Sequence, residues 1–116
     1  MTEQDERTIY EWAHEELKEK TWELRKSKAA PYLPPTAMWN HRHTARILHH
    51  LDMNFAFDVC IPRLEKANVY VSLNEDHVRN GWLLEPVTGY GDEPIQYWDI
   101  DFYTALLAYI KGNPHA

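Results

Sequence analysis

The spacing of apolar residues changes part-way along this chain of 116 residues, and the change limits the folds it can adopt. Up to Asp52 the apolar residues recur every three to four positions, as in amphipathic helices. Over residues 53–61 apolar residues alternate with others, which is the period of a strand with one buried face. A continuing helix is the competing interpretation of this segment, and Pro62 ends it in either case. The sequence therefore predicts helices first and strands after them.

Two helices are expected before the change of period, over residues 3–26 and 37–52. Thr2 is a suitable N-cap for the first, because acidic residues fill the turn that follows it, and Thr36 is a suitable N-cap for the second. The segment 29–36 between them contains three prolines, which exclude a helix and favour an extended connection.

The second half of the chain predicts a small sheet and a last helix. The expected strands are 53–61, 68–73 and 82–87, with a short fourth strand at 95–98, a hairpin connection at 62–67 and a turn at Asn80-Gly81. Asp99 is the expected N-cap of a helix over residues 100–111, which Gly112 and Pro114 close. The predicted fold class is α+β: two N-terminal helices, an antiparallel sheet of three to four strands and a C-terminal helix packed on that sheet, in a single globular domain over residues 1–116.

The predicted core joins the sheet to the last helix. Its members are Phe55, Phe57, Val59, Val69, Val71, Leu106 and Ile110. The last helix is apolar on nearly all sides, which indicates burial in the fold or in an oligomer interface.

Charge and cysteine content exclude several classes of function. The formal charge is −6 with acids and bases interspersed, so no basic groove is available for nucleic acid. Cys60 is the single cysteine and cannot form an internal disulfide, and its apolar neighbours favour an inert core thiol. No signal peptide is visible, so a cytoplasmic location is expected. No apolar stretch approaches about 18 residues, which excludes a membrane span.

Four histidines, His41, His43, His49 and His50, lie close together in the sequence. Metal ligands on one helix are best placed at i and i+4, and no pair here has that spacing. His41 and His43 could chelate together only on an extended backbone. We therefore expect no metal and no cofactor.

Acid–base chemistry is the alternative use of these residues. His49 and Asp52 have a helical i,i+3 spacing, and His50 and His77 could complete a catalytic set with them. Three His and one Gly resemble the pattern of pterin carbinolamine dehydratases, in which His-His-Pro precedes a strand and a further His lies four residues before a Gly. Leu51 replaces the proline here and the spacing is longer. The alternative is thus a His/Asp-based small-ligand-binding protein or a hydrolase- or dehydratase-like enzyme.

The favoured hypothesis is a small acidic module that binds another protein. Aromatic residues make up 13% of the chain, more than the core of so small a domain requires, and aromatic side chains anchor protein interfaces. The candidate binding residues are Trp12, Trp22, Trp39, Trp82 and Trp98. Trp22 is expected to lie off the buried stripe of the first helix, where it would either cover another part of the fold or mark a partner surface. A regulatory or inhibitory role, as in phage or mobile-element proteins that block a host enzyme, fits this size and charge. A homodimer through the last helix or the Trp22 face is also expected.

Overall fold

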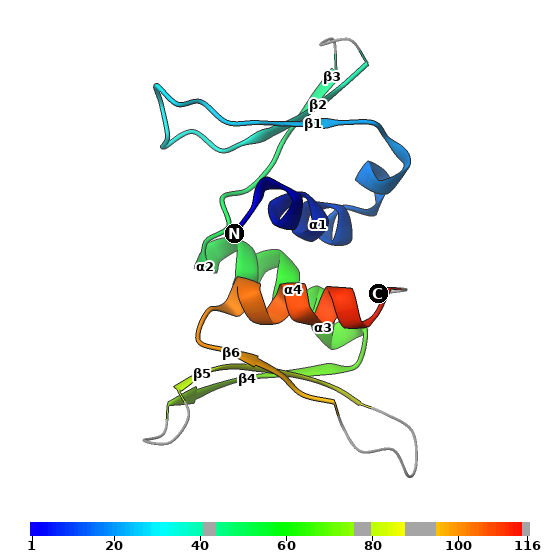
Figure 1. Ribbon diagram of the computed structural model, residues 1–116, viewed down its shortest axis with the longest axis vertical. Helices are drawn as coiled ribbons and strands as arrows, with labels where there is room; N and C mark the ends of the chain where they lie inside the picture. Colours follow the sequence, from blue (N-terminus) through cyan, green and yellow to red (C-terminus); the bar gives the residue numbers. More distant parts are fainter. Residues whose placement is uncertain (41–43, 76–79, 88–94, 115–116) are drawn as a thin grey trace. The chain divides into compact units, whose positions relative to one another are not determined.

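The computed structural model describes residues 1–40, 44–75, 80–87 and 95–114 and has the predicted α+β class. The chain divides into two compact units, Met1–Phe55 (unit 1) and Ala56–Ala116 (unit 2). Each unit contains helices and one three-stranded antiparallel sheet (Figure 1). That residues 1–116 form a single domain stays a prediction.

Unit 1 begins with two helical segments, which are shorter than the predicted helix over residues 3–26. Helix α1, Glu3–Ala13, starts at the predicted N-cap, because the Thr2 hydroxyl accepts a hydrogen bond from the Asp5 N–H and the Asp5 carboxylate accepts one from the Thr2 N–H. A 3₁₀ helix, η1 (Glu15–Glu19), follows. The chain then becomes extended, so the prediction of helix beyond Ala13 is right only for the 3₁₀ turn and wrong for the remainder.

The sheet of unit 1 occupies residues that were expected to be helical. Its strands are β1 (Glu23–Arg25), β2 (Thr36–Trp39) and β3 (Thr44–Ile47), hydrogen-bonded in the order β1-β2-β3. The predicted helix over residues 37–52 is therefore wrong. Asn40 follows β2 with a φ of 56°, a left-handed conformation that asparagine tolerates, and it interrupts any helix there. Pairing between strands satisfies the backbone in place of helical hydrogen bonds.

Residues 53–61 are helical, so the strand predicted there is wrong and the competing interpretation holds. The helical segments are α2 (Met53–Phe55) at the end of unit 1, and the π-helical turn η2 (Ala56–Cys60) and α3 (Ile61–Lys66) in unit 2. Ala56, Cys60 and Leu64 are fully buried and lie four residues apart, the spacing of one helix face.

Pro62 does not end the helical segment, and residues 62–67 are not a hairpin connection. Pro62 lies in the first turn of α3, where a missing N–H is tolerated. The π-helical turn η2 directly precedes α3. Such turns accommodate a local change of hydrogen-bond register.

The sheet of unit 2 confirms the strands predicted at residues 68–73, 82–87 and 95–98. Strands β4 (Val69–Glu75), β5 (Asn80–Pro86) and β6 (Tyr97–Asp99) pair antiparallel in the order β4-β5-β6. Asn80 and Gly81 belong to β5 and not to a turn. Gly81 has a φ of 155°, and a Cβ there would lie 2.5 Å from the Asp99 carbonyl oxygen, so the close approach of β6 requires glycine.

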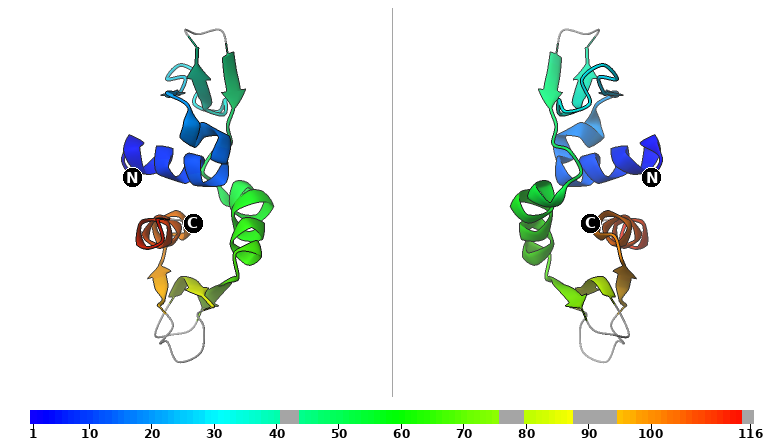
Figure 2. Two further views of the ribbon diagram at one scale, coloured as in Figure 1. Left: turned by 90° about the vertical axis from the view of Figure 1, so that its right-hand side faces the viewer. Right: turned by 90° about the vertical axis from the view of Figure 1, so that its left-hand side faces the viewer.

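The last helix is confirmed, but the predicted N-cap Asp99 is wrong, and Gly112 is the last residue of the helix instead of following its end. Helix α4, Phe102–Gly112, has Asp101 as its N-cap, because the Asp101 carboxylate accepts a hydrogen bond from the Thr104 N–H. The Asp99 carboxylate accepts a hydrogen bond from the Asp101 N–H. Helix α4 packs on β5 and β6, and α3 lies on the same side of the sheet (Figure 2). Trp82 and Phe102 make an edge-to-face contact at 5.2 Å between ring centroids.

The core prediction is partly right. Phe55 is buried in unit 1, and Val69 and Leu106 are buried in unit 2. Val59, Val71 and Ile110 are half-buried. Phe57 is 57% exposed, because a helical segment turns it away from the face that holds Ala56 and Cys60.

Candidate functional site

Two of the five candidate tryptophans belong to the interior of unit 1. Trp12 and Trp22 are buried, and Trp22 is only 1% exposed. The Trp22 indole N–H donates to the Glu11 carboxylate at 3.0 Å, and the Arg7 guanidinium lies 4.8 Å from the ring centroid. The expectation of an exposed Trp22 surface is therefore wrong. Its alternative, that Trp22 covers another part of the fold, agrees with these contacts.

The other three tryptophans remain accessible to different degrees. Trp39 on β2 is half-buried and lies 5.1 Å from the Lys20 ammonium. Trp82 on β5 is half-buried between Phe57 and Phe102. Trp98 on β6 is exposed, which makes it the strongest surface candidate of the five.

Trp98 lies on the face of the unit 2 sheet opposite the helices, which we call the outer face. Directly paired residues of antiparallel strands share a face. Tyr70 pairs with Glu85, Ser72 pairs with Leu83, and Leu83 pairs with Trp98. These five residues form the outer face. Leu84, the neighbour of Leu83 along β5, is fully buried on the inner face.

The outer face exposes two large aromatic side chains. Tyr70 is 63% and Trp98 38% exposed, and both helices of the unit that pack near the sheet lie on its other side (Figure 2). Exposed aromatic groups on a sheet face that no described helix covers mark an interaction site more often than scattered exposed residues do.

Glu85 gives the outer face a negative charge beside the aromatic rings. Its carboxylate accepts a hydrogen bond from the Gln96 amide at 3.4 Å, and no lysine or arginine in the described ranges forms an ion pair with it. Unit 2 holds four Lys and Arg against nine Asp and Glu, a net charge of −5, so it carries most of the −6 of the chain. The outer face therefore lies in a negative field.

Unit 1 contains a pocket of about 370 Å³ with a mixed lining. Its lining residues are Glu6, Tyr10, Lys26, Ser27, Lys28, Pro31, Leu33, Pro35, His50 and Leu51. The prolines and leucines come from the connection between β1 and β2 and from the segment after β3. Of the predicted catalytic residues that the structure describes, only His50 belongs to this lining.

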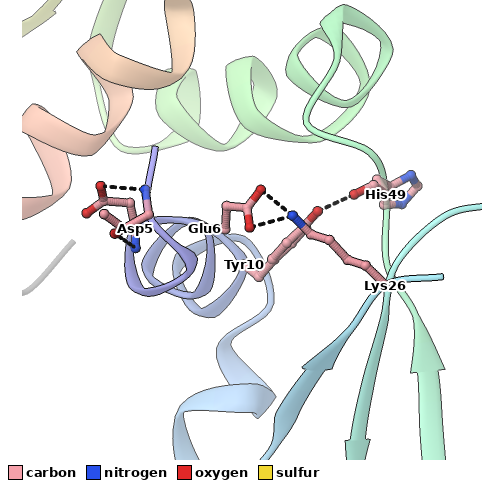
Figure 3. A network of polar contacts seen from close by, with 6 residues as sticks. Asp5, Glu6, Tyr10, Lys26 and His49 are labelled. Atoms are coloured by element: carbon pink, nitrogen blue, oxygen red, sulfur yellow. Dashed lines mark hydrogen bonds and ion pairs between the residues drawn. The ribbon is translucent and has the colours of Figure 1, made fainter. Parts of the chain in front are cut away.

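Two polar contacts fix the side chains at the α1 side of this pocket. The Lys26 ammonium lies 2.6 Å from each oxygen of the Glu6 carboxylate. The Tyr10 hydroxyl donates to the His49 carbonyl oxygen, so His49 contributes its backbone and not its ring (Figure 3). These contacts join α1 to segments that lie far away in the sequence and hold the pocket in shape.

His49 and Asp52, two further residues of the predicted catalytic set, make contacts that stabilise the local fold. The His49 ring stacks on Phe55, with 5.1 Å between ring centroids and 6° between planes. The Asp52 carboxylate accepts from the Phe55 N–H and so caps the start of the following helix. His50 Nε2 lies 3.1 Å from the Tyr32 carbonyl oxygen. His77, like His41 and His43, lies outside the described residues.

Sequence reasoning missed most members of both candidate sites. Tyr70 and Glu85 could have been found, because alternation along each strand assigns them to the face opposite Val69 and Leu84. Glu6, Lys26 and Lys28 gave no signal, since their proximity depends on how α1 packs on the β1–β2 connection.

The chemistry of Cys60 is that of a core thiol. Cys60 is fully buried, and burial raises the pKa of its thiol to about 12, against a smaller opposing effect of Arg63. Within the described ranges, no group of three or more His, Cys, Asp and Glu side chains could hold a metal ion. No helix in the same part of the chain has the length and apolar character needed to cross a membrane.

Comparison of the chain with protein-family models, with curated proteins and with solved structures gave no match.

Proposed function

We propose that this protein is a small acidic interaction module of regulatory or inhibitory type, which binds another protein through the outer face of the β4-β5-β6 sheet. The observation that carries the proposal is the exposure of Tyr70 and Trp98 on a sheet face opposite the helices of unit 2. Tyrosine and tryptophan supply large apolar contact area with few rotatable bonds, and they dominate the binding energy of many interfaces.

The negative charge around the outer face favours a partner with a basic surface. Glu85 can pair with an arginine, and the rings of Tyr70 and Trp98 can stack on its guanidinium. The net charge of −5 on unit 2 attracts a positive surface and raises its rate of association. The same charge opposes binding to nucleic acid, whose phosphates would be repelled.

The cellular setting in this proposal is the cytoplasm of a cell whose enzyme or regulator is the target. The free, buried thiol of Cys60 suits a reducing compartment. The small size and negative charge of the chain suit phage or mobile-element proteins that block a host protein.

A second copy of the chain is a weaker candidate for the occupant of the outer face. The homodimer was expected through the last helix or the Trp22 face, but Trp22 and most apolar residues of α4 are buried. A dimer through the outer face would bring together two units of charge −5, and like charges oppose such an approach. A dimer mass in light scattering at physiological salt would favour self-association instead.

The test uses a double variant of the outer face and a matched control. Tyr70→Thr with Trp98→Thr removes both rings and keeps residues that favour strands. Ile47→Thr on β3 is the control, because Ile47 is more exposed than either ring, at 71%, but lies in unit 1. The wild type, tagged and incubated with extract of the native cell, identifies the partner, and calorimetry with the purified partner measures affinity.

We expect the double variant to weaken binding at least about 30-fold, as the loss of one strong anchor of about 2 kcal/mol would do. Ile47→Thr should leave the affinity unchanged. Glu85→Gln should weaken binding and reduce its dependence on salt concentration. A partner that binds the wild type and the double variant equally would refute the outer face as the binding surface.

A further inference from the structure

The residues that line the pocket of unit 1 include an apolar group and a polar group, which we call the apolar wall and the polar wall. Pro31, Leu33, Pro35 and Leu51 supply the apolar wall, and Glu6, Lys26, Lys28 and His50 supply charged or polar groups. A volume of about 370 Å³ falls within the range of pockets that bind small molecules, roughly 300–1,000 Å³. The pocket thus has the size and the mixed lining of a site for an amphipathic ligand.

The charge balance of the polar wall is positive. Both oxygens of Glu6 contact the Lys26 ammonium, so this pair has no net charge. Lys28 has no carboxylate partner among the residues that the structure describes. His50 approaches the Tyr32 carbonyl oxygen through Nε2, so this nitrogen carries the proton and donates. One uncompensated ammonium beside a neutral pair favours an anion over a cation.

The polar wall is also held in place before a ligand binds. Tyr10 is 1% exposed, and its hydroxyl is fixed on the His49 carbonyl oxygen. The side chain of Glu6 is 20% exposed, and the pairing with Lys26 fixes the position of both groups (Figure 3). A site that is formed in advance loses less entropy when it binds a ligand.

We infer that this pocket binds a small monocarboxylate with an apolar tail. The carboxylate pairs with Lys28, and the tail packs on the prolines and leucines of the apolar wall. A charge-assisted hydrogen bond to the ammonium fixes the orientation of the ligand. The site lies wholly in unit 1 and is independent of the outer face in unit 2.

Three probes of equal length separate charge from apolar contact. Hexanoate, 1-hexanol and hexylammonium are titrated into ¹⁵N-labelled full-length protein, and amide shifts are followed by NMR. Hexanoate should shift the amides of residues 26–30, 32–33 and 50–51 and bind about tenfold more tightly than 1-hexanol, the ratio expected of one contact worth about 1.4 kcal/mol. Hexylammonium should bind more weakly than 1-hexanol. Equal affinities of hexanoate and 1-hexanol, or shifts located elsewhere, would overturn the inference.

A pair of lysine variants tests the assigned cation. Lys28→Met keeps the length of the side chain and removes its charge, and Lys66→Met does the same at an exposed position of α3 in unit 2. Lys28→Met should abolish the preference for hexanoate over 1-hexanol, whereas Lys66→Met should preserve it. Because Lys28 is exposed, its replacement should leave the spectrum of the free protein well dispersed. A preference that survives Lys28→Met would refute the assignment.

Discussion

The contacts within unit 1 differ in kind from the contacts within unit 2. Unit 1 has strands of three or four residues, and ion pairs such as Lys26–Glu6 and Arg46–Glu16 join segments far apart in its sequence. Unit 2 has two strands of seven residues that pair along their whole length, and edge-to-face rings join the sheet to α4. Contacts between sequence neighbours or adjacent strands require a periodic spacing of apolar residues, which can be recognised in the sequence. Contacts between distant segments require no such spacing.

The units differ in charge as well, and this separates their candidate sites. Unit 1 has eight Lys and Arg against nine Asp and Glu, a net charge of −1, whereas unit 2 has −5. An anion is therefore repelled less strongly by unit 1, where the pocket with Lys28 lies. A basic protein surface is attracted more strongly by unit 2, where the outer face lies.

The largest expected effect is the loss of Trp22 in unit 1. Trp22→Ala should lower the free energy of unfolding by about 3–5 kcal/mol, because it leaves a cavity in place of a fully buried ring. Trp98→Ala, on the exposed outer face, is the matched control and should cost about 1 kcal/mol or less. Urea denaturation followed by circular dichroism measures both values, and equal losses would refute the assigned burial.

The same variant tests whether the units form one domain. A single domain over residues 1–116, as predicted, requires the amide NMR signals of both units to disappear at the same urea concentration in Trp22→Ala. Loss of the signals of Met1–Phe55 at lower urea than those of unit 2 would show two domains.

A second comparison uses two phenylalanines of unit 2. Phe102 is buried and makes edge contacts with both Trp82 and Tyr103, whereas Phe57 is exposed and makes an edge contact with Trp82. Phe102→Ala should cost about 3–5 kcal/mol. Phe57→Ala should cost about 1 kcal/mol, the range of a single aromatic pair. A larger loss for Phe57→Ala than for Phe102→Ala in chemical denaturation would reverse the assigned positions of these rings.

The smallest effect at neutral pH concerns Cys60. Its thiol has a pKa of about 12 in the folded protein against 9.0 as the ordinary value. The unfolded chain therefore loses this proton first as the pH rises above 9, and stability falls between pH 9 and 12, by at most about 1.4 kcal/mol per pH unit. Below pH 9 both states are protonated and the effect is absent.

Cys60→Ala isolates this effect, because all other titrating groups stay the same. The free energy of unfolding of the wild type should decline more steeply above pH 9 than that of Cys60→Ala, and the two should run parallel below it. Identical slopes in urea denaturation at pH 8, 9 and 10 would contradict the raised pKa.

Part of the two candidate sites could be predicted from the sequence. Trp98 and His50 were among the predicted site residues, and they lie on the outer face and in the pocket respectively. Whether they act there stays a prediction. Tyr70 and Glu85 were missed although alternation along their strands assigns them to the outer face. Lys26 and Lys28 were missed because their place in the pocket depends on contacts between distant segments.

The sequence by itself determined the α+β class, the cap at Thr2, the strands β4 and β5, and the last helix. Each of these depends on interactions within a few residues or on alternation along one strand. Tertiary structure decided the strands of unit 1 and the helical state of residues 53–61, where alternating apolar residues competed with the i,i+4 spacing of Ala56, Cys60 and Leu64. It also decided the burial of Trp22. The reason is physical: backbone hydrogen bonds to a distant strand, and apolar burial against a distant helix, outweigh local propensities of less than about 1 kcal/mol per residue.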